Sequence, residues 1–307
     1  MLPLRLDLWR ETETGRATLI NLSENHTYRV DGPDGAFALR LHRPGYQNVA
    51  SILSELAWIE ALARDTDLPV VRAVPGRDGA VLQPGAADRH AVLFRFMPGR
   101  EPKHGSPALF ATLGGFAARA HLHAQSWSRP PGFVRPTWSA ATMLGPDGLW
   151  GDWRAAPGVA PYRPLLDSLA ERLAHALSVY GTTPDRFGLI HADMRLANLL
   201  VDGSATTLLD FDDCGFGWFV YDLAAALSFI ETGADRAALQ AAWLDGYRAI
   251  RPLAPEDLAI IPTLILLRRM VLLAWIGSHG ETALAQAHAA DFAADTARLA
   301  RHWGAAL

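Results

Sequence analysis

Four polar side chains within residues 189–213 have the types and the spacing of a phosphoryl-transfer centre: His191, Asp193, Asn198 and Asp210. Transfer of a phosphoryl group requires an attacking hydroxyl aimed in line and a metal ion that neutralises the phosphate charge. An aspartate can accept the hydroxyl proton, and asparagine and aspartate oxygens are ligands that Mg²⁺ prefers. We therefore expect Asp193 to act as the base, and Asn198 and Asp210 to bind the metal ion.

A β-hairpin is the element that must bring these residues together. Two short apolar or β-branched runs flank the turn sequence DGSA at 202–205, which is typical of a hairpin with a loop of about four residues. If Val201 pairs with Thr206, Asn198 lies opposite Leu209 and beside the second aspartate. Any one of these polar residues alone would more often be an ordinary turn residue, so it is their order after a buried strand that favours catalysis.

This segment resembles a known family, the aminoglycoside phosphotransferase and choline kinase branch of the protein-kinase-like fold. Residues HADMRLAN match its pattern His-x-Asp-x-x-x-x-Asn, and an apolar strand followed by LDF matches its Ile/Leu-Asp-Phe. The resemblance is strong over residues 188–227 and looser over 21–123. It implies that His191 and Asp222, the latter in the sequence YDLA, support the catalytic loop without reacting. Ala192 replaces the Arg with which protein kinases commonly read a phosphorylated activation loop, so we expect no such control.

The resemblance implies a bilobal α+β architecture of the protein-kinase-like fold. A small lobe with an antiparallel sheet and one helix, residues 1–97, would bind the nucleotide. A larger, mainly helical lobe, residues 98–307, would carry the catalytic and acceptor sites. The implied cofactors are ATP and Mg²⁺, and the implied reaction moves the γ-phosphoryl group to a hydroxyl of a small molecule. Amino alcohols, amino acids, sugars and aminoglycoside-like antibiotics all remain open as acceptors, as does GTP in place of ATP.

The composition indicates a large folded core and disfavours several partners. The chain has 307 residues, half of them hydrophobic, with a net charge of -4 and no cluster of basic residues that would bind nucleic acid. The N-terminus lacks the pattern of a signal peptide, and the most apolar stretch, 258–276, is interrupted by Arg268 and Arg269, so we expect no membrane span. The single cysteine, Cys214, cannot form an internal disulfide, which suits the cytoplasm. Nothing in the sequence indicates an oligomeric state.

A cation is needed to hold the nucleotide phosphates, and the only lysine, Lys103, lies in a loop-like stretch. Arg40 is the alternative, since it lies on the polar face of the predicted strand 36–42 and its planar fork suits phosphate oxygens. Glu55 lies on the apolar side of the predicted helix 51–64, where an unpaired carboxylate would be costly. We therefore predict an Arg40–Glu55 ion pair. A solvated arginine and a glutamate at the edge of the apolar stripe are the alternatives.

Two further nucleotide contacts are predicted in the first lobe. The sequence INLSENHTYRV contains no glycine, so we expect the phosphates to meet backbone N–H groups and the side chains of Ser23 and Asn25 in a strand-turn-strand. An ordinary surface hairpin would have the same sequence. The predicted strand 91–97 ends at a Pro-Gly pair, and there we expect the backbone of Phe96 and Met97 to meet the adenine ring.

The second lobe is predicted to be helical, because apolar residues recur at helical spacing from residue 107 onward. His121 and His123 lie on different faces of the first helix, so we expect structural roles, with His123 the candidate for a hydrogen bond to the catalytic loop. Acids and aromatic side chains near the C-terminal helices would suit a cationic amine or amino alcohol, although a helical core with an acidic rim would have the same composition. The predicted acceptor contacts are Asp212, Asp213, Trp218, Glu231, Tyr247 and Trp275.

Three other functions remain compatible with the sequence. A bacterial Ser/Thr protein kinase would have the same fold and use the same Asp, Asn and Asp residues. An inactive nucleotide-binding module is disfavoured because all three are intact. A metal-dependent hydrolase using the same acids would usually add histidine ligands, which are missing. The sequence therefore favours a small-molecule phosphotransferase.

Overall fold

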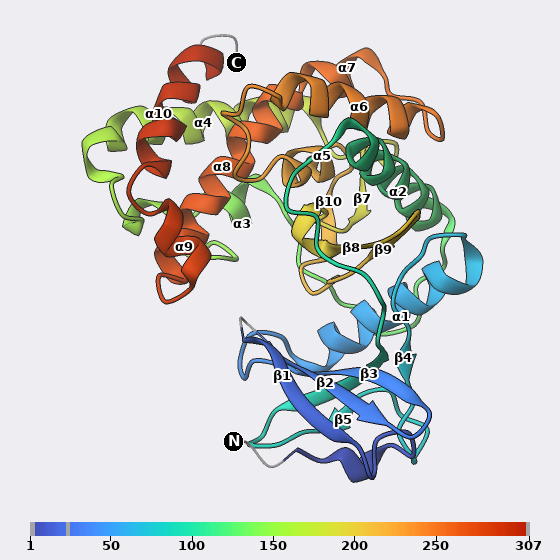
Figure 1. Cartoon of the computed structure of the whole chain (residues 1–307). Helices are drawn as coiled ribbons and strands as arrows, with labels where there is room; N and C mark the ends of the chain where they lie inside the picture. Colours follow the sequence, from blue (N-terminus) through green and yellow to red (C-terminus); the bar gives the residue numbers. More distant parts are fainter. Residues whose placement is uncertain (1–3, 23–24, 305–307) are drawn as a thin grey trace. The chain divides into compact units, whose positions relative to one another are not determined.

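The computed structural model describes residues 4–22 and 25–304, and the chain forms two compact units (Figure 1). The first unit contains the chain up to Pro102 together with Trp127–Arg135 and Ala197–Asp212, and the second contains Lys103–Ser126, Pro136–Leu196 and the chain from Asp213 onward. Asp193 therefore belongs to the second unit, whereas Asn198 and Asp210 belong to the first. Within the sequence, four residues separate Asp193 from Asn198.

The core of the first unit is an antiparallel sheet with the strand order β1-β2-β3-β6-β4, in which β5 also pairs with β6. The strands are β1 (Arg16–Leu22), β2 (His26–Gly32), β3 (Gly35–Leu41), β4 (Ala73–Val74), β5 (Gln83–Pro84) and β6 (His90–Arg95). Because side chains alternate between the two faces of a strand, the apolar residues of β3 share one face and Arg40 lies on the other. Arg40 is paired in register with Val92 of β6.

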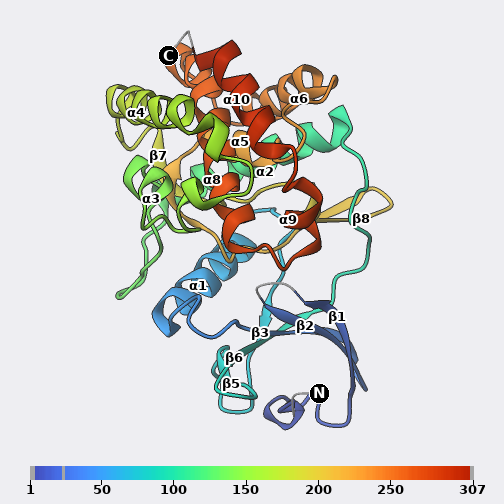
Figure 2. The ribbon, with the colours of Figure 1, turned by 90° about the vertical axis from the view of Figure 1, so that its left-hand side faces the viewer.

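Both faces of this sheet are covered (Figure 2). On the Arg40 face lies α1 (Val49–Asp65), which packs Ile52 and Leu56 against Val92 and Phe94. The opposite face forms a second apolar cluster with Trp9 and with the short 3-10 helix at Leu6–Leu8. The helix α1 begins after Asn48, whose side chain accepts a hydrogen bond from Ser51 N and so satisfies one of the unpaired N–H groups of the first turn.

The predicted hairpin is present as β8 (Leu199–Asp202) and β9 (Ala205–Leu208). Its register is confirmed, because Val201 pairs with Thr206 and the backbone N–H of Leu209 donates to the Asn198 carbonyl at 2.8 Å. The connection is shorter than expected, since Asp202 still pairs with Ala205. Gly203 makes this possible: its φ of 59° is in the left-handed region that a residue without a Cβ adopts readily.

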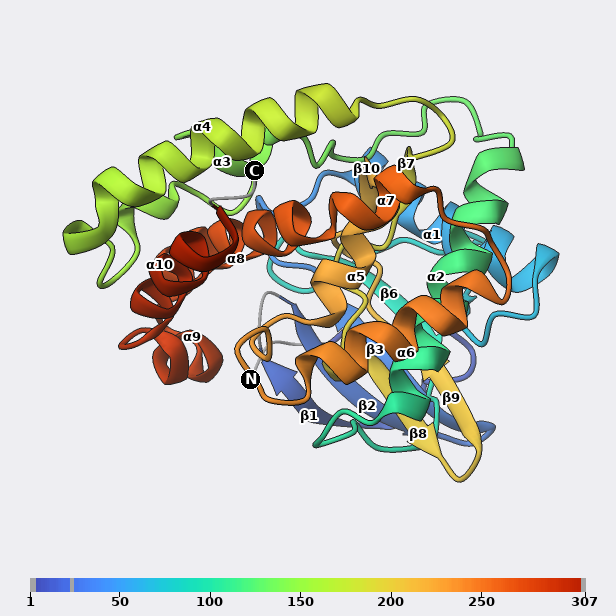
Figure 3. The same cartoon turned by 90° about the horizontal axis from the view of Figure 1, so that it is seen from above.

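The second unit is mainly helical. Its helices are α2 (Pro107–Ser126), α3 (Ala140–Leu144), α4 (Arg163–Tyr180), α5 (Tyr221–Ala226), α6 (Arg236–Arg248), α7 (Pro255–Ala259), α8 (Ile261–Ser278), α9 (Ala283–His288) and α10 (Phe292–Trp303), with short 3-10 helices at Trp153–Ala155 and Ala160–Tyr162. A two-stranded sheet pairs β7 (Phe187–Ile190) with β10 (Gly215–Trp218). Figure 3 shows α10 packed against α4 and α8, an arrangement that places α8 in the interior.

Glycine residues allow α2 and α6 to lie side by side (Figure 1). A Cβ on Gly114 would lie 2.0 Å from the Trp243 carbonyl oxygen, and one on Gly246 would lie 2.0 Å from the Ala111 carbonyl oxygen. Both helix backbones therefore approach each other more closely than any side chain would permit. The close packing places His121 of α2 next to Tyr247 of α6, which matters for the site described below.

By length and composition alone, α8 could cross a membrane, because Arg268 and Arg269 do not reduce its mean hydropathy enough to exclude it. However, 78% of this 18-residue helix is buried inside the protein. The two arginines are buried as well, and each forms an ion pair. The helix α8 is thus a core helix of the second unit with two internal cations.

Candidate active site

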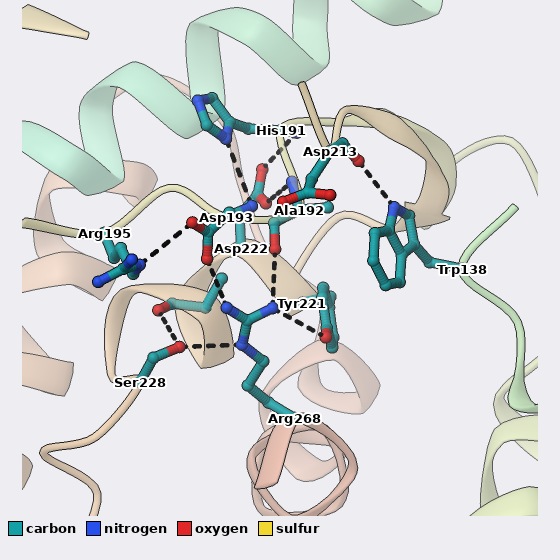
Figure 4. Close-up of polar contacts among 11 residues, drawn as sticks. Trp138, His191, Ala192, Asp193, Arg195, Asp213, Tyr221, Asp222, Ser228 and Arg268 are labelled. Atoms are coloured by element: carbon teal, nitrogen blue, oxygen red, sulfur yellow. Dashed lines mark hydrogen bonds and ion pairs between the residues drawn. The ribbon is translucent and has the colours of Figure 1, made fainter. Parts of the chain in front are cut away.

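Asp193 lies on the loop after β7, and both of its carboxylate oxygens are held by arginines (Figure 4). Arg268 Nη2 donates to Oδ1 at 2.5 Å, and Arg195 Nε donates to Oδ2 at 3.1 Å. Burial by itself would raise the pKa of Asp193, but the charges of Arg195 and Arg268 bring the pKa below its usual value. The carboxylate is therefore ionised and can accept a hydrogen bond or a proton.

Asp222 fixes the loop that carries Asp193. Its Oδ1 accepts a hydrogen bond from Ala192 N at 2.8 Å, and its Oδ2 accepts one from His191 N at 3.2 Å (Figure 4). Ala192 has a φ of 67°, a conformation that costs free energy in a residue with a Cβ and that these hydrogen bonds help to maintain. The His191 ring contributes too, because its Nδ1 accepts from Asp193 N at 3.3 Å.

A buried chain of polar groups holds Asp222 in turn. His121 Nε2 lies 2.9 Å from Asp222 Oδ2, and His121 Nδ1 lies 2.9 Å from the Tyr247 hydroxyl. The oxygen of this hydroxyl accepts a hydrogen bond from Arg251 Nη1 at 2.9 Å. Burial lowers the pKa of His121 in spite of the nearby carboxylate, so the ring is neutral at pH 7. With its proton on Nε2, the neutral ring donates to Asp222 Oδ2 and accepts at Nδ1 from the Tyr247 hydroxyl. His121 thus reaches the catalytic loop by way of Asp222, a contact that the sequence analysis did not include. The prediction that His123 bonds to this loop stays a prediction.

In the first unit, Arg40 and Glu55 form the ion pair that the sequence predicts. Arg40 Nη2 lies 2.7 Å from Glu55 Oε1, and the two side chains are only 10% and 0% exposed. Burial alone would lower the pKa of Arg40, but the charges of Glu55, Asp212 and Asp210 raise it, so the arginine stays protonated. The pair joins β3 to α1 and fixes a cation on the face of the sheet that α1 covers.

Asn198 and Asp210 lie at the open end of the β8–β9 hairpin, and Asp210 lies near Arg40. Leu209 is hydrogen-bonded through its backbone to Asn198, and Asp210 is the residue that follows Leu209. Asp210 Oδ1 is 4.0 Å from Arg40 Nη1, and the Asp210 side chain is 54% exposed. The backbone of Asp210 has a φ of 57°, so this residue is held in the left-handed region.

Asp212 completes this group. Its Oδ2 accepts from Asn25 Nδ2 at 2.9 Å, whereas its Oδ1 is buried without a hydrogen-bond partner in the part of the chain that the structure describes. Asp212 also interacts electrostatically with Arg40 and Glu55. The sequence predicts Asp212 as an acceptor contact, and it lies in the first unit together with Arg40 and Asp210.

The charges of this cluster do not balance. Three carboxylates, those of Glu55, Asp210 and Asp212, face two cations, Arg40 and Arg135, whose charges act on the same glutamate. Three negative and two positive charges leave a net charge of −1. A divalent cation at Asp210, Asp212 and Asn198 would compensate this excess with the oxygen ligands that Mg²⁺ prefers, so the residues present fit such an ion.

Arg135 is a residue that the sequence analysis missed. Its Nη1 donates to the Ser51 carbonyl and to Ser51 Oγ, at 3.1 and 2.9 Å, and its Nη2 donates to the Asp212 carbonyl. Gln47 Nε2 donates to the same carbonyl at 3.2 Å. Arg135 therefore links α1, which carries Glu55, to the backbone of Asp212. No pattern in the surrounding Pro-rich sequence identifies it.

The other predicted nucleotide contacts have varied surroundings. Asn25 is buried and also accepts from Arg43 N at 3.1 Å, so both ends of its amide are engaged by protein groups. Ser23 lies outside the described residues. The Phe96 N–H donates to the Ala36 carbonyl at 3.1 Å, which directs this donor to the sheet. Met97 follows it, half-buried, at the end of the segment that continues β6.

The predicted acceptor contacts have different surroundings in the structure. Trp218 is buried and donates to the Gly181 carbonyl at 2.8 Å. Tyr247 is buried in the chain that holds Asp222, and Glu231 is buried in an ion pair with Arg269 at 2.8 Å. The partners of these three side chains are thus groups of the protein interior.

Trp275 and Asp213 are less buried. Trp275 is half-buried and stacks on His279 with a centroid distance of 5.2 Å. Asp213 is half-buried beside the Asp193 loop, where its carbonyl accepts from Trp138 Nε1 at 2.9 Å (Figure 4). Of the acceptor contacts predicted in the second unit, Asp213 is the one that the close-up places with Asp193.

A family model describing the phosphotransferase enzyme family matches residues 17–253, and the chain belongs to this family. Homoserine kinase of Acidiphilium cryptum is 31% identical over 248 residues, which cover 78% of this chain and 73% of that protein. Amicoumacin kinase of Bacillus subtilis is 23% identical over 266 residues, which cover 81% of this chain and 76% of that protein.

Solved structures agree with this assignment. A microcompartment-associated aminopropanol kinase is 42% identical, with a TM-score of 0.89 over 98% of this chain and 96% of that chain. An amicoumacin kinase solved with AMP-PNP and Ca²⁺ is 21% identical, with a TM-score of 0.77 over 95% of this chain and 90% of that chain. The chain is therefore a kinase with the bilobal protein-kinase-like fold, and the fold class and family predicted from the sequence are confirmed.

Proposed function

We propose that the protein transfers the γ-phosphoryl group of ATP to the hydroxyl of a small amino alcohol of the aminopropanol class, with Mg²⁺ as the metal ion. One observation carries the choice of acceptor, namely the 42% identity to an aminopropanol kinase over 98% of the chain. The homoserine kinases among the relatives favour the same general chemistry. Aminopropanol and homoserine both present a hydroxyl and an ammonium group on a short carbon chain.

Residues of the first unit hold the nucleotide in this proposal. Arg40, fixed by Glu55, donates to the phosphate oxygens, because a charge-assisted donor held by a buried carboxylate stays in place when the phosphates arrive. Asn198 and Asp210 bind Mg²⁺, and Asp212 Oδ1, which accepts no hydrogen bond from the described residues, supports an additional ligand role. When bound, Mg²⁺ neutralises charge on the phosphates.

Further residues of the first unit contribute to this nucleotide site. The segment with Ser23 and Asn25 contacts the phosphates through its backbone. The Phe96 carbonyl and the Met97 backbone meet the adenine ring. These contacts use main-chain groups, which accept a nucleotide without the glycine-rich loop of protein kinases.

The second unit supplies the base. The acceptor hydroxyl donates its hydrogen bond to Asp193 and passes its proton there as the new O–P bond forms. The bond between the γ-phosphorus and the β–γ bridging oxygen breaks, and ADP leaves. Asp222, with His121 behind it, keeps the loop in the conformation that presents the carboxylate. Because the pKa of Asp193 lies below its usual value, this base is weak and accepts the proton late.

A panel of acceptors tests the proposal. Purified protein with ATP and Mg²⁺ is given aminopropanol, ethanolamine, choline, homoserine, a neutral diol and an aminoglycoside, and ADP release is measured together with the mass of the phosphorylated product. We expect the highest kcat/KM for aminopropanol and a large loss for the neutral diol, which lacks the ammonium group. Higher turnover of the diol or of the aminoglycoside would contradict the proposed class.

Two controls separate the remaining functions. Incubation of a cell extract with the protein and labelled ATP should place the label on small molecules, whereas label on proteins would indicate a protein kinase. Phosphate release that is independent of any added hydroxyl compound would indicate a hydrolase. Asp193→Ala serves as the blank in both assays.

A further inference from the structure

We propose that Arg268 is a positioning residue that fixes Oδ1 of Asp193, so that Oδ2 becomes the oxygen that receives the acceptor proton. This inference rests on the proposed function and assigns different roles to Arg268 and Arg195. Both contact the same carboxylate, yet they differ in burial and in the number of their partners. The difference determines which carboxylate oxygen can exchange partners during a catalytic cycle.

Arg268 is held on every side (Figure 4). It is 1% exposed, and its Nε donates to Ser228 Oγ at 2.9 Å, its Nη1 to the Ala192 carbonyl at 3.2 Å, and its Nη2 to Asp193 Oδ1 at 2.5 Å. The guanidinium also lies over the Trp150 ring, 5.0 Å from its centroid. Moving it would leave a buried charge without partners, which is costly. The Oδ1 contact is therefore permanent.

Arg195 is more exposed than Arg268. Its side chain is 25% exposed, and its contact with Asp193 is a single hydrogen bond of 3.1 Å from Nε to Oδ2. Water can replace this bond, and a partly exposed arginine can leave at less cost than a buried one. When Arg195 leaves, the acceptor hydroxyl can donate its hydrogen bond to Oδ2 in its place. In the reaction the hydroxyl proton moves to Oδ2, the acceptor oxygen bonds to the γ-phosphorus, and the bridging P–O bond of ATP breaks.

The loop geometry gives Arg268 a second effect on the same residue. By donating to the Ala192 carbonyl as well as to Asp193, it binds the main chain and the side chain of two successive residues. Asp222 holds the N–H of Ala192 from the other side. Ala192 is thus held at both its N–H and its carbonyl, and Arg268 also restricts the side-chain torsion of Asp193.

The next residue along α8 is a matched control. Arg269 is 2% exposed and has the same type of environment, with an ion pair to Glu231, a bond to Thr296 Oγ1 at 3.0 Å and a bond to the Phe292 carbonyl at 3.1 Å. These partners lie away from Asp193. Arg268→Met and Arg269→Met therefore each remove one buried cation from one helix, and only the first removes the contact with the base.

The experiment compares Arg268→Met, Arg268→Lys and Arg269→Met with wild type by thermal unfolding, by KM for ATP and by kcat for the best acceptor. We expect both methionine variants to lose thermal stability. Only Arg268→Met should lose about 100-fold in kcat, the scale of a 1 Å misplacement, with KM for ATP changed less than about threefold. Arg268→Lys should recover part of kcat, because lysine restores the charge but not the planar fork.

Each result of this experiment either supports or contradicts the positioning role of Arg268. A kcat of Arg268→Met within about threefold of wild type, or an equal loss of kcat in Arg269→Met, would overturn the positioning role while the kinase activity of wild type stood. If Arg268→Met does not fold, Arg268→Lys decides: a loss of about tenfold or more in kcat at unchanged KM for ATP supports the role, and an unchanged kcat overturns it. If wild type phosphorylates no hydroxyl compound, the proposed function fails, and this inference fails with it.

Discussion

The Arg40–Glu55 pair allows stability and function to be separated by a double substitution. Arg40→Met leaves the fully buried Glu55 without its partner, and removal of one member of a buried pair costs about 3–5 kcal/mol. Glu55→Leu should cost a similar amount for the converse reason. Replacement of both members by apolar side chains is often neutral or stabilising, so we expect Arg40→Met/Glu55→Leu to recover to within about 1 kcal/mol of wild type.

The formal charges of the cluster show what each substitution changes. Wild type has two positive and three negative groups, a net charge of −1; Arg40→Met gives −2, Glu55→Leu gives 0, and the double variant returns to −1 with Arg135, Asp210 and Asp212 remaining. Urea unfolding at constant slope measures the stability of the four proteins. If the pair exists for nucleotide binding, the double variant should regain stability but not ATP affinity.

The expected loss of affinity follows from the bond that Arg40 would make to phosphate. A hydrogen bond to a charged group contributes about 1.5–3 kcal/mol, so the dissociation constant for ATP with Mg²⁺ should rise about 10- to 100-fold in both Arg40 variants. Calorimetric titration measures it directly. A double variant that binds ATP as tightly as wild type would refute the reasoning, and so would an Arg40→Met protein as stable as wild type.

Three further predictions concern separate parts of the site. Asp193→Asn should reduce kcat about 10²- to 10⁴-fold and leave ATP affinity largely unchanged, and a variant that keeps more than a tenth of kcat would remove Asp193 from the role of base. Arg135→Met should lower stability by about 2–3 kcal/mol and also raise KM for ATP, because it loses its bonds to α1 and to the Asp212 carbonyl; a change in stability alone would contradict the link to the nucleotide. Burial, followed by nearby positive charges, lowers the pKa of His42 to about 2, so below pH of about 6.5 the unfolded chain takes up a proton that the folded chain refuses. Urea unfolding should show stability falling by up to about 1.4 kcal/mol per pH unit below that value, and a His42→Leu variant with an equally steep slope would assign the dependence to other groups.

Local spacing made part of the site predictable. The hairpin register followed from two short runs around a turn sequence, because a strand has a period of two and a short turn fixes the pairing. The Arg40–Glu55 pair followed from burial, since a glutamate on the apolar side of a helix requires a cation and the neighbouring strand offered one. Both arguments used residues at most 15 positions apart.

The groups that hold Asp193 and Asp212 could not be assigned in this way. Arg268 is 75 positions from Asp193, Arg135 is 77 from Asp212, and His121 is 101 from Asp222. Helical periodicity indicates which face of a helix is buried but not which element lies against that face. For the same reason His121 and His123 could be placed on different faces, while the histidine that reaches the loop could not be chosen between them.

The arginine pair in α8 nevertheless contained a usable constraint. An apolar helix of 18 residues with two adjacent arginines must either expose them or supply partners, since a buried unpaired charge costs several kcal/mol. Adjacent residues on a helix point about 100° apart, so two separate partners are required. Asp193 and Glu231 are these partners. Both arginines are buried and paired, and only the partner of Arg268 is the proposed base, so kcat should be more sensitive to a change at Arg268 than at Arg269.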